Sequence, residues 1–501
     1  MSLCDPSTFA SLSLPVSTGL LSLDAIPVTN FSAEVPGPYR LTQPSISYTS
    51  LSFCNVTLTY THPGQIDYVT IEAWLPEPTA WNSRLQALGG GGWQAGRFLL
   101  PYMGMQGAIG DGYLTITTDG GLGYAQTARE WALLSEGNVN LYALQNLASV
   151  SLGDEAAIGK ALAEVYYGKK PDFSYWNGCS GGGRQGLMLA QRYPDAYDGI
   201  AAGAPVIYWN EIMPGAIWPQ MVMNWEQGWP RLCEMQAILK NATAECDGLD
   251  GVVDGVVGDP EACLATFDPF ALVGKEVVCE EPAAETIRVI SAVAAKVLNA
   301  TWHGRETVDG RKKWYGLTPG AAVATEPLGI ALTDCSNGTC VGKPATLGLD
   351  WLGLFVAKSE SFDASLLTHE EFDRFVYRAK QQWASIVETD DTDLSEFRDR
   401  GGKIISWHGL IDQIVSAKGP EKYYQDVSAL LPNTDQFFRH YEIPGLEHCF
   451  GGPSGNPTTM FDELRAWVEN GTAPESLPIE LTVSPTETHS RIICPYPARA
   501  K

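Results

Sequence analysis

The chain has 501 residues, of which 45% are apolar and 18% are charged, and its formal net charge is −25. This length and apolar content suffice for a large buried core and argue against intrinsic disorder. The negative charge repels phosphate backbones and anionic lipid headgroups, so we expect neither a nucleic-acid partner nor a membrane partner. No stretch approaches ~20 uninterrupted apolar residues, so no membrane-spanning helix is expected.

The first part of the chain alternates between strand-like and helix-like segments. Residues 67–76 place Val69, Ile71, Ala73 and Leu75 at every second position, which is the period of a half-buried strand. Along this part of the chain, predicted strands are followed by predicted helices. This order of elements predicts a mostly parallel sheet with helices on both faces, an α/β fold. Further strands are predicted at 84–93 (running into a glycine-rich turn), 112–119, 173–178 and 197–205, and helices at 140–168 and 184–193.

The alternation stops after Pro205 and resumes at residue 401. Residues 206–400 are rich in Trp, Cys, Asp and Pro and show no steady pattern. We therefore predict one α/β catalytic domain built from residues 1–205 and 401–501, with residues 206–400 inserted as a lid domain. In the last part, strands are predicted at 401–409 and 437–445, and helices at 421–431 and 459–470, the latter stopping at Gly471.

Residues 175–186, YWNGCSGGGRQG, place a serine between glycines. Gly178, Ser180 and Gly182 fit the pattern G-x-S-x-G between a predicted strand and a predicted helix. In that context the serine occupies a tight, strained turn, and the helix N-terminus offers N–H groups to a developing oxyanion. We therefore predict that Ser180 is a nucleophile.

A serine nucleophile needs a base, and the base needs an acid that orients it. Asp412 follows the predicted strand 401–409, and His448 follows the next one. This gives the chain order Ser, Asp, His that serine hydrolases of α/β type use. His408 is the competing base, but it precedes Asp412 and would break that order.

Two cysteines stand directly beside the proposed catalytic residues. Cys179 precedes Ser180, and Cys449 follows His448. If Ser180 and His448 come within hydrogen-bond reach, their neighbours can meet the Cα separation of ~4.4–6.8 Å that a disulfide requires. Such a bond would fix the base loop against the nucleophile turn.

The segments GCSGGGRQG, HGLIDQIVSAKG and GLEHCF, together with RYPDAYDGIAAGAP, resemble the tannase and feruloyl esterase family of secreted α/β-hydrolases. The similarity runs from about residue 50 to residue 470. It implies an α/β-hydrolase fold with Ser180 as nucleophile, Asp412 and His448 as its partners, and a Cys179–Cys449 disulfide.

The segment LGGGGWQAG at 88–96 follows an early predicted strand, where such hydrolases place the second oxyanion-hole N–H. We predict that Gly91 or Gly92 acts there together with the N–H of Gly181. A flexible glycine turn without such a role is the alternative.

The segment CDGLDGVVDGVV at 246–257 carries three carboxylates in one glycine-bearing loop, and hard oxygen ligands of this kind suit Ca²⁺. An acidic turn that binds no metal is the alternative. The spacing is not that of an EF-hand, but it matches the lid calcium loop of the resembled family. That match implies the side chains of Asp247, Asp250 and Asp254 and the carbonyls of Val252 and Val256 as ligands of a structural ion. We expect no organic cofactor.

The eleven cysteines and the sequons indicate a secreted protein whose signal peptide is missing from the sequence. A cytosolic protein with reduced thiols is the alternative. Cys246 with Cys263, Cys4 with Cys54, and Cys335 with Cys340 are plausible disulfides. The pairing of Cys233, Cys279 and Cys494 stays open, and at least one of the three is unpaired within the chain. Six Asn-x-Ser/Thr sequons are candidate glycosylation sites: Asn30, Asn55, Asn241, Asn299, Asn337 and Asn470.

The expected function is that of a secreted serine carboxylesterase acting on esters of aromatic acids through an acyl-enzyme. Hydroxycinnamoyl (feruloyl) esters are the first expectation, either small or linked to a plant polymer. Galloyl esters, as for a tannase, and other phenolic esters or depsides are the alternatives. A lipase or peptidase, or a non-catalytic binding protein that kept the fold, is a further alternative. Trp209, Trp218, Trp225 and Trp229 could wall an aromatic slot, although ordinary core packing explains each one equally well.

Overall fold

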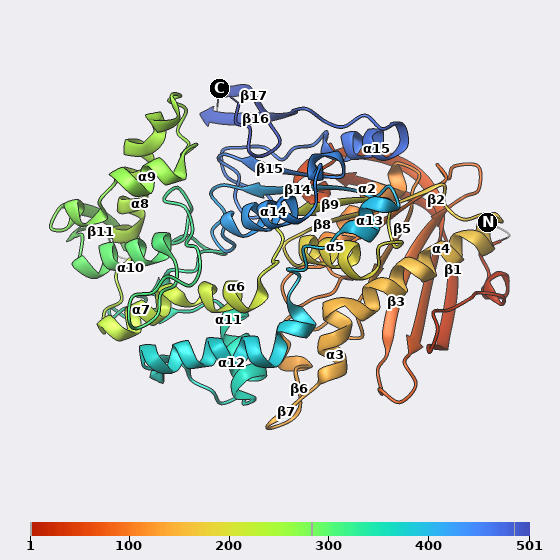
Figure 1. Ribbon diagram of the computed structural model, residues 1–501, viewed down its shortest axis with the longest axis horizontal. Coiled ribbons are helices and arrows are strands. Elements are labelled where there is room, and N and C mark those ends of the chain that lie inside the picture. The colour runs from red at the N-terminus through yellow and green to blue at the C-terminus, as the bar shows by residue number, and fades with distance from the viewer. Residues whose placement is uncertain (1–2, 282–283, 485, 501) are drawn as a thin grey trace.

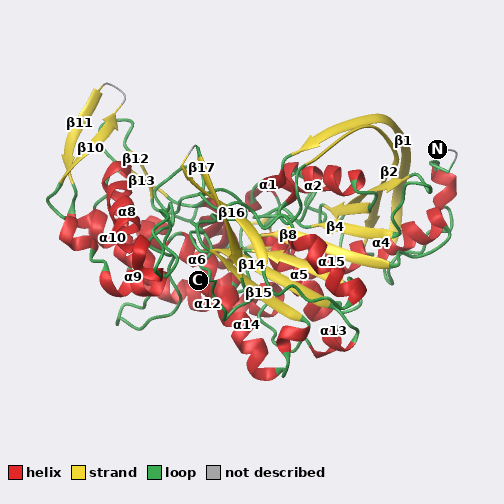
Figure 2. Ribbon diagram, turned by 90° about the horizontal axis from the view of Figure 1, so that it is seen from above, coloured by secondary structure: helices red, strands yellow, loops and turns green. Residues whose placement is uncertain are grey.

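A computed structural model describes residues 3–281, 284–484 and 486–500. Its centre is a nine-stranded sheet with the order β1-β2-β3-β5-β4-β8-β9-β14-β15 (Figures 1 and 2). The strands from β5 to β15 in that order pair in parallel, and β3, β2 and β1 extend the sheet through antiparallel pairs. The strands are β1 (Gly19–Val35), β2 (Ile46–Thr61), β3 (Val69–Pro76), β4 (Arg84–Leu88), β5 (Leu114–Thr118), β8 (Phe173–Cys179), β9 (Gly199–Gly203), β14 (Lys403–Gly409) and β15 (Phe438–Ile443).

The parallel strands are buried on both faces, so they do not alternate between buried and exposed residues, and even their polar side chains, such as Gln86, Thr115 and Ser406, are buried. Neighbouring residues point to opposite hydrophobic clusters, as Tyr175 and Trp176 do in β8 and Ile404 and Ile405 in β14. Helices therefore cover both faces, as the sequence predicts. One face packs against α4 (Ser151–Tyr167), α5 (Gly181–Arg192) and α14 (Lys418–Leu430), and the other against α2 (Leu99–Gly110) and α15 (Met460–Asn470).

Between β9 and β14 the described residues add no strand to the central sheet. This segment, green to cyan in Figure 1, lies beside the sheet and is mostly helical. Its Trp209, Trp351 and Phe355 share a buried cluster with Trp93 of the glycine-rich loop. Its elements are α6 (Trp209–Ala216), α7 (Trp218–Glu226), α8 (Leu232–Cys246), α9 (Pro260–Thr266), α10 (Ala292–His303), α11 (Thr346–Asp350), α12 (His369–Val387), α13 (Ser395–Asp399) and the hairpins β10 (Glu276–Glu281)–β11 (Ala284–Val289) and β12 (Leu332–Asp334)–β13 (Val341–Lys343).

The strands and helices predicted for the two ends of the chain are confirmed to within a few residues. The predicted helix at 140–168 is divided into α3 (Leu141–Gln145) and α4 by a π-helical stretch at Asn146–Val150, and it ends at Gly168 with φ 77°. In the described part of the chain, no helix is long and apolar enough to cross a membrane. The remaining elements are α1 (Gly37–Arg40), β6 (Leu133–Ser135), β7 (Asn138–Val139) and a C-terminal hairpin, β16 (Leu477–Ser484) and β17 (Glu487–Ile493).

Candidate active site

Ser180 lies in the sharp turn between β8 and α5. β8 ends at Cys179 and α5 begins at Gly181, while Ser180 itself has φ 62° and ψ −121°. Non-glycine residues rarely adopt this conformation, and such strain clusters at functional sites. The Ser180 N–H donates to the Gly203 carbonyl at 2.9 Å, which ties the turn to β9.

Glycines make this turn possible because backbones approach closely on both sides of it. A Cβ on Gly178 would lie 2.7 Å from the Gly182 carbonyl carbon, and one on Gly183 would lie 2.1 Å from the Gly203 oxygen. Both distances are shorter than real Cβ contacts. The glycine run is therefore required by packing as well as by the turn.

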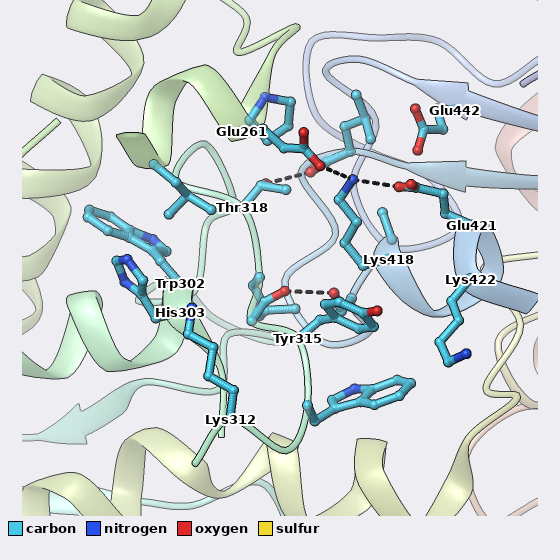
Figure 3. Close-up of a pocket in the computed structure, with 18 of the residues that line it drawn as sticks. Glu261, Trp302, His303, Lys312, Tyr315, Thr318, Lys418, Glu421, Lys422 and Glu442 are labelled. Carbon is cyan, nitrogen blue, oxygen red and sulfur yellow. Dashed lines mark hydrogen bonds and ion pairs between the residues drawn. The ribbon is translucent and has the colours of Figure 1, made fainter. Parts of the chain in front are cut away.

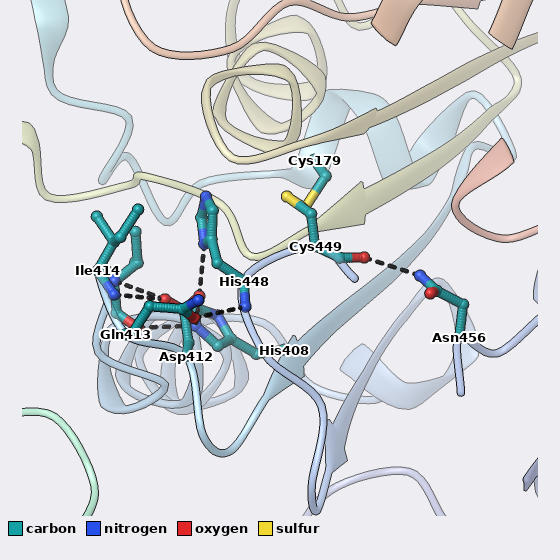
Figure 4. Close-up of a disulfide and its surroundings, with 9 residues drawn as sticks. Cys179, His408, Asp412, Gln413, Ile414, His448, Cys449 and Asn456 are labelled. Atoms are coloured by element: carbon teal, nitrogen blue, oxygen red, sulfur yellow. Dashed lines mark hydrogen bonds and ion pairs between the residues drawn. A yellow bond between two sulfur atoms is a disulfide. The ribbon is translucent and has the colours of Figure 1, made fainter. Parts of the chain in front are cut away.

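Asp412 and His448 meet across two loops that follow neighbouring parallel strands. Asp412 comes three residues after the end of β14, and His448 follows β15. The Asp412 Oδ2 and His448 Nδ1 atoms are 2.6 Å apart (Figure 4). Because a carboxylate only accepts hydrogen bonds, Nδ1 carries the proton and Nε2 is left free to take one from a nucleophile.

Four donors surround the Asp412 carboxylate. The N–H groups of Ile414 and Val415 donate to Oδ1, each at 2.8 Å, while His448 and His408 lie at Oδ2. Burial alone would raise the pKa of Asp412, but the His448 charge and the hydrogen bonds from His408 and His448 hold this pKa well below its usual range. The acid is therefore ionised across the neutral pH range.

The two histidines that compete for the role of base differ in position. His408 is fully buried, and its Nε2 lies 3.1 Å from Asp412 Oδ2 and 3.0 Å from the Val415 carbonyl oxygen. His448 lines a cavity together with Ser180, whereas His408 does not. The geometry therefore favours His448 as the base and makes His408 a second support of the acid.

The cavity at Ser180 is small and apolar. Its volume is about 30 Å³, which is room for about two water molecules. An aromatic acyl group can enter only when side chains move. Of the four tryptophans singled out above, only Trp209 lines this cavity. Its other apolar walls are Val206, Ile212, Met213, Ala216, Leu347, Ile414 and Val415.

Two glycine backbones face each other at the cavity. A Cβ on Gly181 would lie 3.4 Å from the Gly92 nitrogen, and both residues line the cavity. The Gly91 N–H donates instead to the Gln94 carbonyl at 3.0 Å, while the Gly92 N–H has no acceptor in the described part of the chain. This favours Gly92 over Gly91 as the partner of Gly181 in an oxyanion hole.

Gln185 and Gln413 are site residues that sequence reasoning missed. The Gln185 side chain accepts from the Gly90 N–H at 2.8 Å and donates to the Ala95 carbonyl at 3.0 Å, which holds the glycine-rich loop against α5. Gln413 accepts the His448 N–H at 3.0 Å. Both side chains are buried in the structure. In the sequence, the only available signal was that both residues lie inside the motifs quoted above.

A disulfide joins Cys179 to Cys449, with their Cα atoms 5.9 Å apart (Figure 4). It connects the strained Ser180 turn to a second strained position, because Cys449 has φ 66°. The Cys449 carbonyl accepts a hydrogen bond from Asn456 at 2.8 Å. The loop that carries His448 is thus tied to the nucleophile turn on one side and to Asn456 on the other.

Four further disulfides are present, and one cysteine is free. Cys233 pairs with Cys279, which the sequence left open, and Cys494 is unpaired and half-buried. The other pairs are Cys4–Cys54, Cys246–Cys263 and Cys335–Cys340. Among the sequon residues, Asn55 and Asn299 are half-buried, whereas Asn30, Asn241, Asn337 and Asn470 are exposed.

The acidic loop after α8 curls around one carboxylate. Asp247 Oδ1 accepts the N–H groups of Asp254, Gly255 and Val256 at 2.9 to 3.3 Å, and Asp250 Oδ1 accepts that of Val252 at 2.9 Å. Burial, and then the charges of Asp247 and Asp250, raise the pKa of Asp254. Among the residues that the structure describes, no three His, Cys, Asp or Glu side chains converge as a metal-binding group.

Comparison with known proteins places this geometry in a family. The sequence profile described as "Tannase and feruloyl esterase" matches residues 54–501. A probable feruloyl esterase of Arthroderma benhamiae is 38% identical over 97% of this chain and 89% of its own length, and a tannase of Aspergillus oryzae is 25% identical over the same shares.

A solved structure agrees with these relatives. The tannin acyl hydrolase from Aspergillus niger superposes with a TM-score of 0.88 at 28% identity, over 99% of this chain and 92% of that one. The chain therefore belongs to the tannase and feruloyl esterase family, has the α/β-hydrolase fold, and is a carboxylic ester hydrolase.

Proposed function

We propose that this chain hydrolyses hydroxycinnamoyl (feruloyl) esters, with Ser180 as nucleophile, His448 as base and Asp412 as the acid that orients it. The observation that carries the assignment is the cavity that Ser180 shares with His448, with Asp412 bonded behind the imidazole. The preference for feruloyl over galloyl esters is supported by the relative named a probable feruloyl esterase. A tannase-like preference is the second candidate, supported by the tannin acyl hydrolase structure.

In the proposed reaction, the Ser180 hydroxyl attacks the ester carbonyl carbon while His448 Nε2 takes its proton. Asp412 stabilises the imidazolium that forms. The N–H groups of Gly181 and Gly92 donate to the oxyanion, and the loss of one such donor typically lowers kcat by ~10²–10³. The imidazolium then protonates the leaving alcohol, and water releases the acid from Ser180 by the reverse sequence.

We expect the wild-type protein to release free acid from methyl ferulate with a kcat/KM at least tenfold above that for methyl gallate. The two esters differ in acyl group and share the same leaving alcohol, so the ratio reports on the acyl site alone. Chromatography of the released acids gives both rates. Faster release of gallic acid would replace the feruloyl assignment with a tannase assignment.

We propose that residues 206–400 act as a lid over this site. The support is that α6 of this segment contributes Trp209, Ile212 and Met213 to the cavity wall, and α11 contributes Leu347. The sheet domain contributes the catalytic groups. The lid therefore supplies most of the apolar walls that the acyl group would contact, and Ile414 and Val415 of the sheet domain supply the rest.

We propose that the acidic loop binds a structural Ca²⁺ through Asp247, Asp250 and Asp254, with the carbonyls of Val252 and Val256. The donor set suits Ca²⁺, because all of these ligands are hard oxygens from one short loop. Burial, and then the charges of Asp247 and Asp250, raise the pKa of Asp254, and a divalent cation would relieve that repulsion. The adjacent Cys246–Cys263 disulfide holds both ends of the loop.

Removal of calcium with a chelator is therefore expected to lower the melting temperature by roughly 5 °C. Calorimetry of the protein before and after chelation, and after calcium is restored, measures this shift. An Asp247→Asn variant should melt at the chelated temperature and fail to respond to calcium. An unchanged melting temperature in the wild-type protein would contradict the proposal.

We also propose that the protein is extracellular. Five disulfides in one chain indicate an oxidising compartment. Four exposed sequons are compatible with glycosylation in a secretory pathway. Treatment of the natively produced protein with an endoglycosidase should lower its mass if any of them is occupied.

A further inference from the structure

The lid segment meets the sheet domain through contacts of two different kinds. Across a crevice, Glu261 of the lid segment pairs with Lys418 at the start of α14, at 2.6 Å (Figure 3). Both side chains are partly exposed, and ion pairs of this kind contribute little to holding two surfaces together. The second contact is a dry cluster of aromatic rings around Trp93 of the glycine-rich loop. This cluster is the firmer attachment, and it lies next to a proposed oxyanion-hole donor.

Trp93 occupies the tip of a tight turn. Gly91 and Gln94 exchange two backbone hydrogen bonds, each at 3.0 Å, which leaves Gly92 and Trp93 as the two central residues. Gly92 has φ 54°, the positive angle that the first central position of a type II′ turn requires. Because two bonds close a turn of only two residues, a shift of Trp93 moves Gly92 with it.

Gly92 faces the nucleophile turn from this position. Its nitrogen lies 3.4 Å from where a Cβ of Gly181 would be, and both glycines line the catalytic cavity. Gln185 bonds the loop at Gly90 and Ala95, which are the residues just outside the turn on either side. Gln185 therefore holds the base of the turn, and its tip needs a support of its own.

The Trp93 indole gives the tip that support. It is 3% exposed, and in the described part of the chain its ring nitrogen has no hydrogen-bond partner, so packing alone holds it. Phe355 and Trp351 stack on it with ring centroids at 5.3 and 6.3 Å, and Trp209 meets it edge-on at 5.3 Å. These are the arrangements that aromatic pairs prefer. All three rings belong to the lid segment.

Trp209 also connects the lid segment to the other half of the oxyanion hole. The Arg184 guanidinium lies 5.6 Å from the centre of the Trp209 ring, within the range of a cation–π contact. Arg184 is buried in the first turn of α5, the helix that begins with Gly181. The lid rings thus contact the Gly92 turn through Trp93 and the Gly181 helix through Arg184.

We propose that Trp93 is a positioning residue for the oxyanion hole. The lid rings hold its indole, and the tight turn passes that placement on to the Gly92 N–H. The inference rests on the proposed function, because it takes Gly92 as an oxyanion donor. It goes beyond that function by giving the lid segment a part in the rate of the reaction as well as in the walls of the acyl site.

The first test measures hydrolysis of p-nitrophenyl acetate, which reports on ester cleavage whichever phenolic acid the enzyme prefers. Trp93→Leu is expected to lower kcat and kcat/KM together by about 30-fold, because a displaced donor forfeits part of the ~10²–10³-fold that a lost donor costs. Trp93→Phe keeps an aromatic ring in the cluster and should restore kcat to within about threefold of the wild type.

Trp131→Leu is the matched control, assayed like the others below its melting temperature. Trp131 is also buried, its ring nitrogen also lacks a partner in the described structure, and it joins the same cluster from the sheet domain. It lies outside the turn and the cavity, so its kcat should stay at the wild-type value. Wild-type kcat in Trp93→Leu, or an equal loss in Trp131→Leu, would overturn the proposal.

A milder pair of variants tests the lid side of the contact, even if Trp93→Leu fails to fold. Phe355→Leu removes the ring that stacks on Trp93 and should lower kcat about fivefold with KM unchanged. Phe372→Leu removes a ring that is equally buried in the lid segment but packs against Trp218 and Trp225, and it should keep its kcat. Equal kcat values in the two variants would overturn the role of the lid rings.

A binding measurement separates positioning from stability. Phenylboronic acid forms a tetrahedral adduct in which the Ser180 oxygen bonds to boron, its proton passes to His448, and a boronate oxygen occupies the oxyanion site. Calorimetric titration should show binding weakened about tenfold in Trp93→Leu and unchanged in Trp131→Leu, and unchanged binding in both would overturn the proposal. If these shifts appear while the wild-type protein releases no acid from methyl ferulate, the feruloyl assignment fails and the role of Trp93 stands.

Discussion

Replacement of both Cys179 and Cys449 by alanine is expected to lower the free energy of unfolding by up to about 5 kcal/mol and to lower kcat by about 10²-fold. The bond closes 270 residues of chain, and loops of this length give the largest entropic stabilisation. The loss of activity has a separate cause. The bond joins the turn of Ser180 to the loop of His448, and a misplacement of reacting groups by ~1 Å can cost ~10²-fold in rate.

The Cys4→Ala, Cys54→Ala double variant is the matched control. It removes a bond that closes 50 residues between the N-terminus and β2, with an expected stability loss of about 4 kcal/mol. Both double variants are assayed below their melting temperatures, so that each is folded. The control should keep its kcat, whereas a Cys179 and Cys449 double variant with wild-type kcat would show that the bond does not position the site.

Ser180→Ala is expected to lower kcat for methyl ferulate by about 10⁶-fold, because triad residues act as a unit and the loss of one removes most of their joint effect. The fold should survive, since no hydrogen bond of the Ser180 hydroxyl is present in the described structure. Ser454→Ala is the control, because it also removes a hydroxyl without a hydrogen-bond partner, but at a buried position outside the cavity. Residual activity above about 1% in the Ser180 variant would contradict a nucleophilic role.

The sheet and its covering helices could largely be predicted from local patterns. The alternation of Val69, Ile71 and Ala73 marks β3, and Gly471 marks the end of α15. β1 and β2 escaped prediction, and for β1 the reason is physical. β1 is mostly exposed, so selection for an apolar face is weak there and its alternation is faint.

The residues of the candidate site could be predicted because each lies at the end of a predicted strand, where topology brings strand ends together. The choice between Gly91 and Gly92 as the oxyanion-hole donor could not be predicted from the sequence. It depends on a single hydrogen bond, from the Gly91 N–H to the Gln94 carbonyl, that no spacing reveals. The role of Gln185 likewise depends on where α5 meets the glycine-rich loop.

The disulfides, too, could be predicted from the sequence only in part. Cys179 and Cys449 could be paired because each adjoins a residue with a defined place in the site. Cys233 and Cys279 could not, since their bond depends on how α8 packs against the hairpin strand β10. Tertiary packing inside the insert thus limited prediction more than local chemistry did.

The central claim is that Ser180 is an activated nucleophile, and covalent labelling tests it most directly. The wild-type protein is treated with a fluorophosphonate, digested, and the modified residue is identified by mass spectrometry. We predict one phosphonylated residue, Ser180, with labelling abolished in Ser180→Ala and retained in Ser454→Ala. Labelling at another serine, or none in an enzyme that hydrolyses methyl ferulate, would contradict the claim.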